Sequence, residues 1–305
     1  MARRIPIEGD PTAIGEARTI PFARVPNPGT LFERRSARLK RLSGDTGIGP
    51  YIAFLADLVA AQGRVSASLG EPAPHDEAAV ARAVEHGMPP LDRSNFRIGE
   101  TFSRITDSLF SEAAAIDQPQ AASQALERVR NAGPAELGAM VGHVLADSLP
   151  VEAMAEHVYV AAALQVQFVR AASLLPERDL KAVGDGVCPG CGGAPLGSVI
   201  VGWPQAGGAR YCVCSLCSTY WHHVRIKCVL CSATGGIKYQ EIEGGPGTIK
   251  AETCETCRTY VKIFNQQKDS GFEPLADDVG SLGVDLLMQG TEFRRGAFNP
   301  FLAGY

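Results

Sequence analysis

No cysteine precedes Cys188 in this 305-residue chain, although the chain has nine in all. No run approaches about 18 uninterrupted apolar residues, so a membrane-spanning helix is not expected. Aromatic residues make up only 7% of the chain and the formal net charge is −4, so the composition does not favour nucleic-acid binding. There is no phosphate-binding loop, no nucleophile elbow and no convincing pair of acidic residues. We therefore do not expect an enzyme.

The start of the chain, Met-Ala-Arg-Arg-Ile-Pro-Ile-Glu-Gly-Asp, has basic residues but no apolar stretch after them. A secretory or twin-arginine export signal requires such a stretch. We therefore expect a cytoplasmic protein. In that reducing compartment, clustered cysteines indicate metal ligands rather than disulfides.

Eight of the nine cysteines form a repeat of two copies with a constant offset, so that Cys188 corresponds to Cys228 and Cys217 to Cys257. In each copy, two CxxC pairs are separated by a segment long enough for a β-hairpin. A CxxC turn holds two sulfurs on one side of a tight loop, and two such turns joined by a hairpin converge on one tetrahedral site. The sequence therefore predicts two four-thiolate metal sites. Site 1 consists of Cys188, Cys191, Cys214 and Cys217, and site 2 consists of Cys228, Cys231, Cys254 and Cys257.

The spacing does not identify the metal, because four thiolates suit both Zn²⁺ and iron. The charge of this region is informative instead. Residues 188–268 contain eight Lys and Arg but only four acidic residues. Eight thiolates and two divalent ions leave a net negative charge, so we interpret the basic surplus as compensation for the metal sites. This interpretation argues against a free basic patch for nucleic acid.

The ninth cysteine, Cys212, stands outside the repeat, and Glu252 occupies the corresponding place in the second copy. One hypothesis is an inert, half-buried thiol, which is the commoner case for a free cysteine. The alternative is a reactive thiol that neighbouring charges activate. His222 and His223 follow the first copy, and we interpret them as linker or interface residues because four sulfurs already complete each site.

The hydrophobic pattern predicts an α+β protein whose character changes near residue 185. We expect a helical domain of five to seven helices, with Val151–Leu175 as its central helix. In each copy we expect one hairpin, and residues 274–290 are expected to form a helix with Leu282, Leu286 and Leu287 on its apolar face. The predicted units are a loosely ordered arm (1–29), the helical domain (30–185), a first four-Cys ribbon (186–227), a second four-Cys ribbon (228–268), and a C-terminal helix and tail (269–305).

The run Cys-Ser-Leu-Cys-Ser-Thr-Tyr-Trp-His-His-Val-Arg-Ile-Lys-Cys-Val-Leu-Cys at 214–231 resembles the formate dehydrogenase accessory proteins, the FdhE family. Cys188-Pro-Gly-Cys191, Glu252-Thr-Cys-Glu-Thr-Cys257 and Asn299-Pro300 support the resemblance. The resemblance implies a cytoplasmic protein that is needed to mature respiratory formate dehydrogenases before export. It also implies contact with their catalytic, molybdenum-containing subunit and rubredoxin-like iron at the four-Cys sites.

Our leading hypothesis is a helical domain followed by two rubredoxin-like or zinc-ribbon hairpin modules, acting as an accessory factor for formate dehydrogenase. A redox role of the metal sites stays open, as does self-association. The alternatives are a structural zinc-ribbon module that binds another protein and a double ribbon that binds nucleic acid. A thiol oxidoreductase that uses Cys212 is a further alternative.

Overall fold

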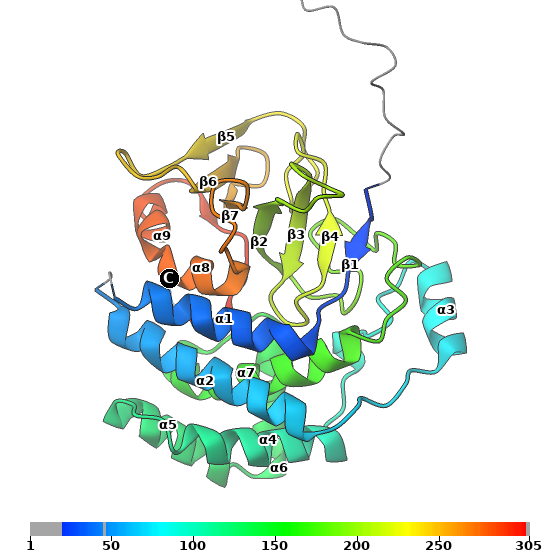
Figure 1. Ribbon diagram of the computed structural model, residues 1–305, viewed down its shortest axis with the longest axis vertical. Coiled ribbons are helices and arrows are strands. Elements are labelled where there is room, and N and C mark those ends of the chain that lie inside the picture. The colour runs from blue at the N-terminus through cyan, green and yellow to red at the C-terminus, as the bar shows by residue number, and fades with distance from the viewer. Residues whose placement is uncertain (1–19, 45–46, 303–305) are drawn as a thin grey trace, which may run out of the picture.

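The computed structural model describes residues 20–44 and 47–302, which form a layer of helices beneath a β-sheet (Figure 1). Up to residue 185, this described part contains seven α-helices, at the upper end of the predicted range. They are α1 (Pro28–Leu42), α2 (Gly49–Ser68), α3 (Glu77–Glu85), α4 (Glu100–Ala113), α5 (Gln120–Asn131), α6 (Pro134–Leu145) and α7 (Met154–Ala172). Among the described residues, no helix is both long enough and apolar enough to cross a membrane.

Helix α7 is the centre of the helical layer. Nearly every residue from 156 to 170 is buried, and α2, α4, α5 and α6 pack around it. A helix that is apolar on all sides is stable only when other elements surround it, so the even distribution of apolar residues in this segment explains its position. The predicted central helix is confirmed.

Local capping explains where several helices begin. The Asn27 side chain accepts a hydrogen bond from the backbone N–H of Gly29 at the start of α1, and Pro28 occupies the first turn. At the start of α3, the Asp76 carboxylate accepts hydrogen bonds from the backbone N–H groups of Ala78 and Ala79. Such caps satisfy backbone donors that have no partner within the helix.

Within the described residues, the sheet has eight strands: β1 (Ala23–Arg24), β2 (Pro195–Ile200), β3 (Arg210–Cys214), β4 (Tyr220–His222), β5 (Ile237–Gln240), β6 (Ile249–Cys254), β7 (Thr259–Asn265) and β8 (Arg294–Arg295). Their order is β1-β4-β3-β2-β7-β6-β5, and β8 pairs with β7. The two predicted hairpins correspond to β2–β3 and β5–β6, which are antiparallel. The confirmed fold class is thus α+β, with the helices first and the sheet after them.

The two copies of the sequence repeat lie side by side in this one sheet. The first copy contributes β4-β3-β2 and the second β7-β6-β5, in the same order. Their registers are equivalent, because Cys212 lies opposite Trp221 in the first copy and Glu252 opposite Val261 in the second. Parallel pairing of β2 with β7 joins the copies. The sequence predicted neither this junction nor the third strand of each copy.

The start of the described chain also belongs to the sheet. Strand β1 pairs with β4, and Ala23 lies opposite Trp221. Residues 1–19 of the predicted arm lie outside the described residues. The predicted boundaries between the five units of the chain stay a prediction.

The C-terminal helix differs from the expectation. It is divided at Ser281 into α8 (Pro274–Gly280) and α9 (Leu282–Met288). Leu282 is buried as predicted, but Leu286 is 51% exposed and Leu287 42% exposed, so their assignment to the apolar face is wrong. The structure buries Asp285 of α9 instead.

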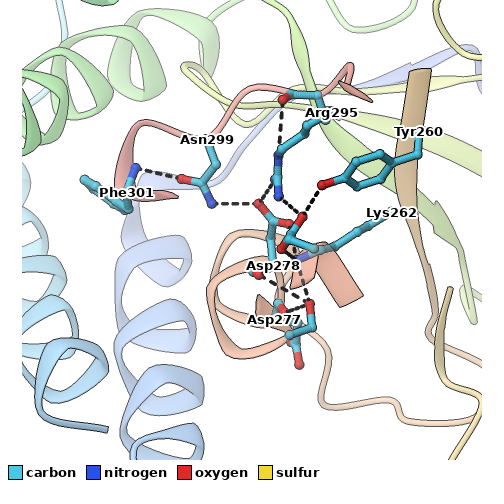
Figure 2. A network of polar contacts seen from close by, with 10 residues as sticks. Tyr260, Lys262, Asp277, Asp278, Arg295, Asn299 and Phe301 are labelled. Carbon is cyan, nitrogen blue, oxygen red and sulfur yellow. Dashed lines mark hydrogen bonds and ion pairs between the residues drawn. The ribbon is translucent and has the colours of Figure 1, made fainter. Parts of the chain in front are cut away.

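Buried cations on the sheet explain why carboxylates face inward here (Figure 2). Lys262 of β7 lies 2.5 Å from Asp285 and 3.1 Å from Asp278, and all three side chains are at most 1% exposed. Arg295 bonds to both carboxylates, and Asn299 donates to Asp278 at 2.8 Å. A buried ammonium group requires charged partners, so the helices present Asp278 and Asp285 to Lys262. Leu286 and Leu287 of α9 are left exposed.

Candidate metal centres

Site 1 gathers its four cysteines from two turns. Cys188 and Cys191 precede β2, whereas Cys214 ends β3 and Cys217 lies in the turn between β3 and β4. The Sγ atoms of Cys188 and Cys217 are 3.6 Å apart, and those of Cys191 and Cys214 are 3.4 Å apart. All four Sγ atoms lie within 4.8 Å of one another, and none of the four residues is more than 1% exposed.

Site 2 repeats this arrangement in the second copy but is more open. The Sγ atoms of Cys228 and Cys257 are 3.8 Å apart, and those of Cys231 and Cys254 are 3.7 Å apart. Cys228 and Cys254 are buried, whereas Cys231 and Cys257 are partly exposed. The two sites thus have the same donors and a different accessibility to solvent.

The donors fit a tetrahedral metal ion. A metal–sulfur distance of about 2.3 Å gives sulfur–sulfur edges of about 3.8 Å in a regular tetrahedron. The distances in both sites are close to this value or slightly shorter. Each cluster could therefore hold one Zn²⁺ or one iron ion, and the donor set does not distinguish them.

The backbone of all four CxxC turns adopts the same conformation. The residue after the second cysteine has a positive φ in each turn: 77° at Gly192, 59° at Ser218, 56° at Ser232 and 56° at Arg258. This left-handed conformation favours glycine, so three of the turns hold a residue that is strained there. The sequence identified only Gly192 as adapted to this place. The four turns thus share one backbone conformation although only one of them has glycine at this place.

Backbone N–H groups and threonine hydroxyls surround the sulfurs. The N–H groups of Leu216 and Cys217 each donate to Cys214 Sγ at 3.4 Å. The hydroxyl of Thr219 is 3.1 Å from Cys217 Sγ, and that of Thr259 is 2.9 Å from Cys257 Sγ. The two threonines occupy equivalent positions in the two copies, so the repeat Cys-x-Thr-Tyr contained this signal although it had no assigned role. The backbone N–H donors favour the thiolate form that binds metal.

Burial and hydrogen bonding act on the thiols in opposite directions. Burial raises the pKa of Cys188 well above its usual range. Burial also raises the pKa of Cys254, but hydrogen bonds from the backbone of Cys257 and Thr256 outweigh it and bring that pKa to about 7. Metal binding requires thiolates, so a cation that enters site 1 must displace protons from a dry environment.

The helical layer covers site 1 through a segment that sequence reasoning missed. Leu91 N–H donates to the carbonyl of Gly190 at 2.9 Å, and Arg93 N–H donates to the carbonyl of Cys191 at 3.1 Å. The Arg93 guanidinium forms two hydrogen bonds with Asp147, at 2.8 and 2.6 Å. Burial lowers the pKa of Arg93, but Asp147 and the nearby thiols of site 1 outweigh burial and raise that pKa above its usual value. No motif links residue 93 to residue 191, so only the fold could reveal this contact.

The surplus of Lys and Arg in residues 188–268 was expected to compensate the charge of the thiolates, but the structure gives most of these side chains other partners. Five of the eight basic side chains in residues 188–268 form ion pairs with carboxylates rather than lying against the sulfurs: Arg210, Lys238, Lys250, Arg258 and Lys262. Several of their partners, such as Asp278, lie outside that range, which is why the charge count of the range alone misled.

Cys212 is fully buried in the sheet, opposite Ser198 and Trp221. Burial raises the pKa of its thiol to about 12, although Arg210 lowers it. These surroundings favour an inert thiol over a reactive one. His222 is the last residue of β4 and its backbone N–H donates to the carbonyl of Phe22, whereas His223 follows the strand and its ring is 3.1 Å from the carbonyl of Lys227.

Comparisons with known proteins cover the whole described chain. Three family profiles match: "FdhE, N-terminal" at residues 20–185, "FdhE, central domain" at 187–225 and "FdhE, C-terminal domain" at 226–302. "Protein FdhE homolog" from Rhizobium meliloti (strain 1021) is 42% identical over 302 residues, which is 98% of this chain and 99% of the relative. "Protein FdhE homolog" from Cronobacter sakazakii (strain ATCC BAA-894) is 34% identical over 94% of this chain and 92% of its own length.

A solved structure has the same fold. The crystal structure of the FdhE protein from Pseudomonas aeruginosa superposes with a TM-score of 0.79 at 30% identity. The match covers 93% of this chain and 99% of that one. With its two four-cysteine clusters in one sheet and its similarity along almost the whole length, this chain belongs to the FdhE family.

Proposed function

We propose that this protein binds two metal ions through its eight paired cysteines and acts as an accessory factor in the maturation of respiratory formate dehydrogenase. It would act in the cytoplasm and contact the catalytic subunit, without being an enzyme itself. Two four-thiol clusters built into a single sheet, in a chain of the FdhE family, are the observation that carries this proposal.

The proposed ligands are the four cysteines of site 1 and the four of site 2. We favour iron, because of the resemblance to rubredoxin-like sites, over zinc. Bound iron would supply a one-electron redox change, whereas zinc would supply only structure. In either case the chain orients the sulfurs through the left-handed residue of each turn and through the Thr219 and Thr259 hydroxyls.

The difference in exposure supports separate roles for the sites. Site 1 lies in the main core and is covered by the segment around Leu91 and Arg93, so its proposed role is to hold the sheet against the helices. Site 2 has two partly exposed cysteines. Ile226, in the segment before its first cysteine, is 69% exposed. We propose that the catalytic subunit contacts the surface around site 2, since exposed apolar side chains favour protein interfaces.

Metal content tests the first part of the proposal. We expect two metal ions per chain after anaerobic purification, and one per chain after Cys191→Ser or Cys231→Ser, because three thiolates leave the tetrahedron incomplete. An iron–thiolate site absorbs visible light and a zinc site does not, so the absorption spectrum identifies the metal. Metal-free protein with a native fold would contradict the proposal.

Affinity capture tests the partner. The tagged protein should recover the catalytic subunit from a lysate that contains formate dehydrogenase. Ile226→Asp should reduce the recovery several-fold, because a charge at an apolar contact must lose its water. Val151→Asp is the matched control, since Val151 is 71% exposed but lies in the helical layer. Equal recovery by the two variants would exclude the surface near site 2, and no recovery by the native protein would exclude the partner.

A further inference from the structure

A cavity of about 350 Å³ opens on the sheet at the junction of the two copies. Its lining includes Ile200 of β2, Ile263 of β7 and Lys250 of β6. Successive residues of a strand point to opposite faces, and Lys262 points to Asp278 of α8. Ile263 and the cavity therefore lie on the face that α8 leaves uncovered. The cavity exists only because β2 and β7 pair.

The lining is strongly basic. It contains Arg210, Arg225, Lys250 and Lys268, and no carboxylate. Glu252 pairs with Arg210, and Glu241 pairs with Lys250. Arg225 and Lys268 have no carboxylate partner among the described residues, and the Lys268 ammonium group donates to the backbone carbonyl of Gly247. A concave surface with two uncompensated cations concentrates anions.

Arg210 differs from the other cations of the cavity because its side chain is buried. Its side chain is 0% exposed and donates to Glu252 at 2.8 Å and to the carbonyl of Lys227 at 3.3 Å. Its buried Nε–H has no acceptor among the described residues. This Nε–H is closed to solvent, so Arg210 contributes a fixed positive charge beneath the cavity, and the more exposed Arg225, Lys250 and Lys268 are the groups that can contact a bound anion.

The remaining lining is apolar and aromatic. Ile200 and Ile263 provide aliphatic surface, and the Tyr239 side chain stands half exposed at the cavity. The volume lies in the range of sites for small organic molecules, about 300–1,000 Å³, and is larger than a single inorganic anion needs. Cations together with an aromatic side chain suit a ligand that has both a charged group and a flat ring.

We propose that this cavity binds an organic phosphate. Its phosphoryl group would lie among Arg225, Lys250 and Lys268, and its ring would lie against Tyr239. This site is separate from the two cysteine clusters and does not depend on the proposed role in formate dehydrogenase maturation.

Isothermal titration of the full-length protein at low ionic strength tests this proposal. The probes are adenosine 5′-monophosphate, inorganic phosphate and adenosine. We expect the nucleotide to bind more tightly than either part alone, and its affinity to fall as salt is added, because salt screens the cations. Arg225→Gln and Lys268→Gln should each weaken nucleotide binding about tenfold, as expected for loss of one charge-assisted hydrogen bond.

The matched control is Arg130→Gln, which removes an exposed arginine from the last turn of α5, outside the cavity lining. It should leave the affinity unchanged. Arg210 is kept in every variant, because its loss would leave Glu252 buried without its partner. The proposal is overturned if the nucleotide does not bind, or if the cavity variants bind it like the control. If inorganic phosphate and the nucleotide bind with equal affinity, the nucleotide ring does not contact Tyr239 and the proposal of an organic phosphate is overturned.

Discussion

At the scale of single residues, the sequence located the two four-cysteine clusters because the information is local. A CxxC turn holds its two sulfurs together by its own backbone, and the constant offset between the copies links equivalent cysteines. The contacts of Arg93 with Cys191 and Asp147 had no such signal, because these three residues are brought together only by the packing of the helices against the sheet. The same holds for Lys262 and its aspartates.

The left-handed residue of the first CxxC turn leads to a residue-scale prediction. Gly192→Ala should lower the free energy of unfolding by about 1–2 kcal/mol, because alanine is strained at positive φ. The added Cβ would also lie 3.3 Å from the Pro89 side chain. Urea denaturation of the metal-bound protein measures the change.

Gly138→Ala is the control for that substitution. Gly138 lies within α6 and has open space around its Cα, so alanine there should raise the free energy of unfolding by about 0.5–1 kcal/mol. Destabilisation by both substitutions would show that the loss at Gly192 does not come from its backbone conformation.

At the scale of elements, the hydrophobic pattern of the segments between the CxxC pairs identified the hairpins β2–β3 and β5–β6, but the third strand of each copy was missed. Strand β4 is only three residues long, Tyr220–His222, and follows directly on the cysteine turn, so it offers too short a pattern. The prediction of the apolar face of α9 was wrong for a different reason. Hydrophobicity favours burial of Leu286 and Leu287, but the buried charge of Lys262 selects the face that carries Asp285.

The buried ion network between β7 and the C-terminal helices leads to an element-scale prediction. Lys262→Met should lower the free energy of unfolding by about 3–5 kcal/mol, because it leaves Asp278 and Asp285 buried with one fewer cation. Lys238→Met, which breaks the exposed pair with Glu255 on β5, should change stability little. Thermal unfolding followed by circular dichroism compares the two variants, and similar losses in both would refute a special role of the network.

At the scale of the whole molecule, the two four-cysteine clusters differ through their surroundings and not through their donor atoms. Site 1 belongs to the main hydrophobic core together with residues of α2, α4 and α7, whereas site 2 lies toward the edge of the sheet. Identical motifs therefore occupy a dry and a partly wet environment. The sequence could not indicate this difference, because the repeat makes the two sites look equivalent.

This asymmetry predicts metal release in two phases. A thiol-competent chelator in excess should remove one metal ion rapidly, from site 2, because Cys231 and Cys257 are open to solvent. The second ion should leave site 1 slowly, since the helical layer must first open. The two phases can be followed by a colorimetric metal indicator.

The Cys231→Ser variant identifies the phases. It should lose the fast phase and keep the slow one, whereas Cys191→Ser should keep the fast phase. A single phase in the native protein, or a fast phase that survives Cys231→Ser, would contradict the assignment.

The sequence by itself determined the α+β class, the central helix α7, the two hairpins and the grouping of eight cysteines into two sites, because periodicity and ligand spacing are properties of neighbouring residues. Only the tertiary structure decided that the copies share one sheet through β2 and β7, that site 1 is buried and site 2 is not, and that four basic residues surround a cavity at the junction. These features depend on contacts between distant segments. Their physical origin is the packing of the helical layer and of α8 and α9 against selected parts of the sheet.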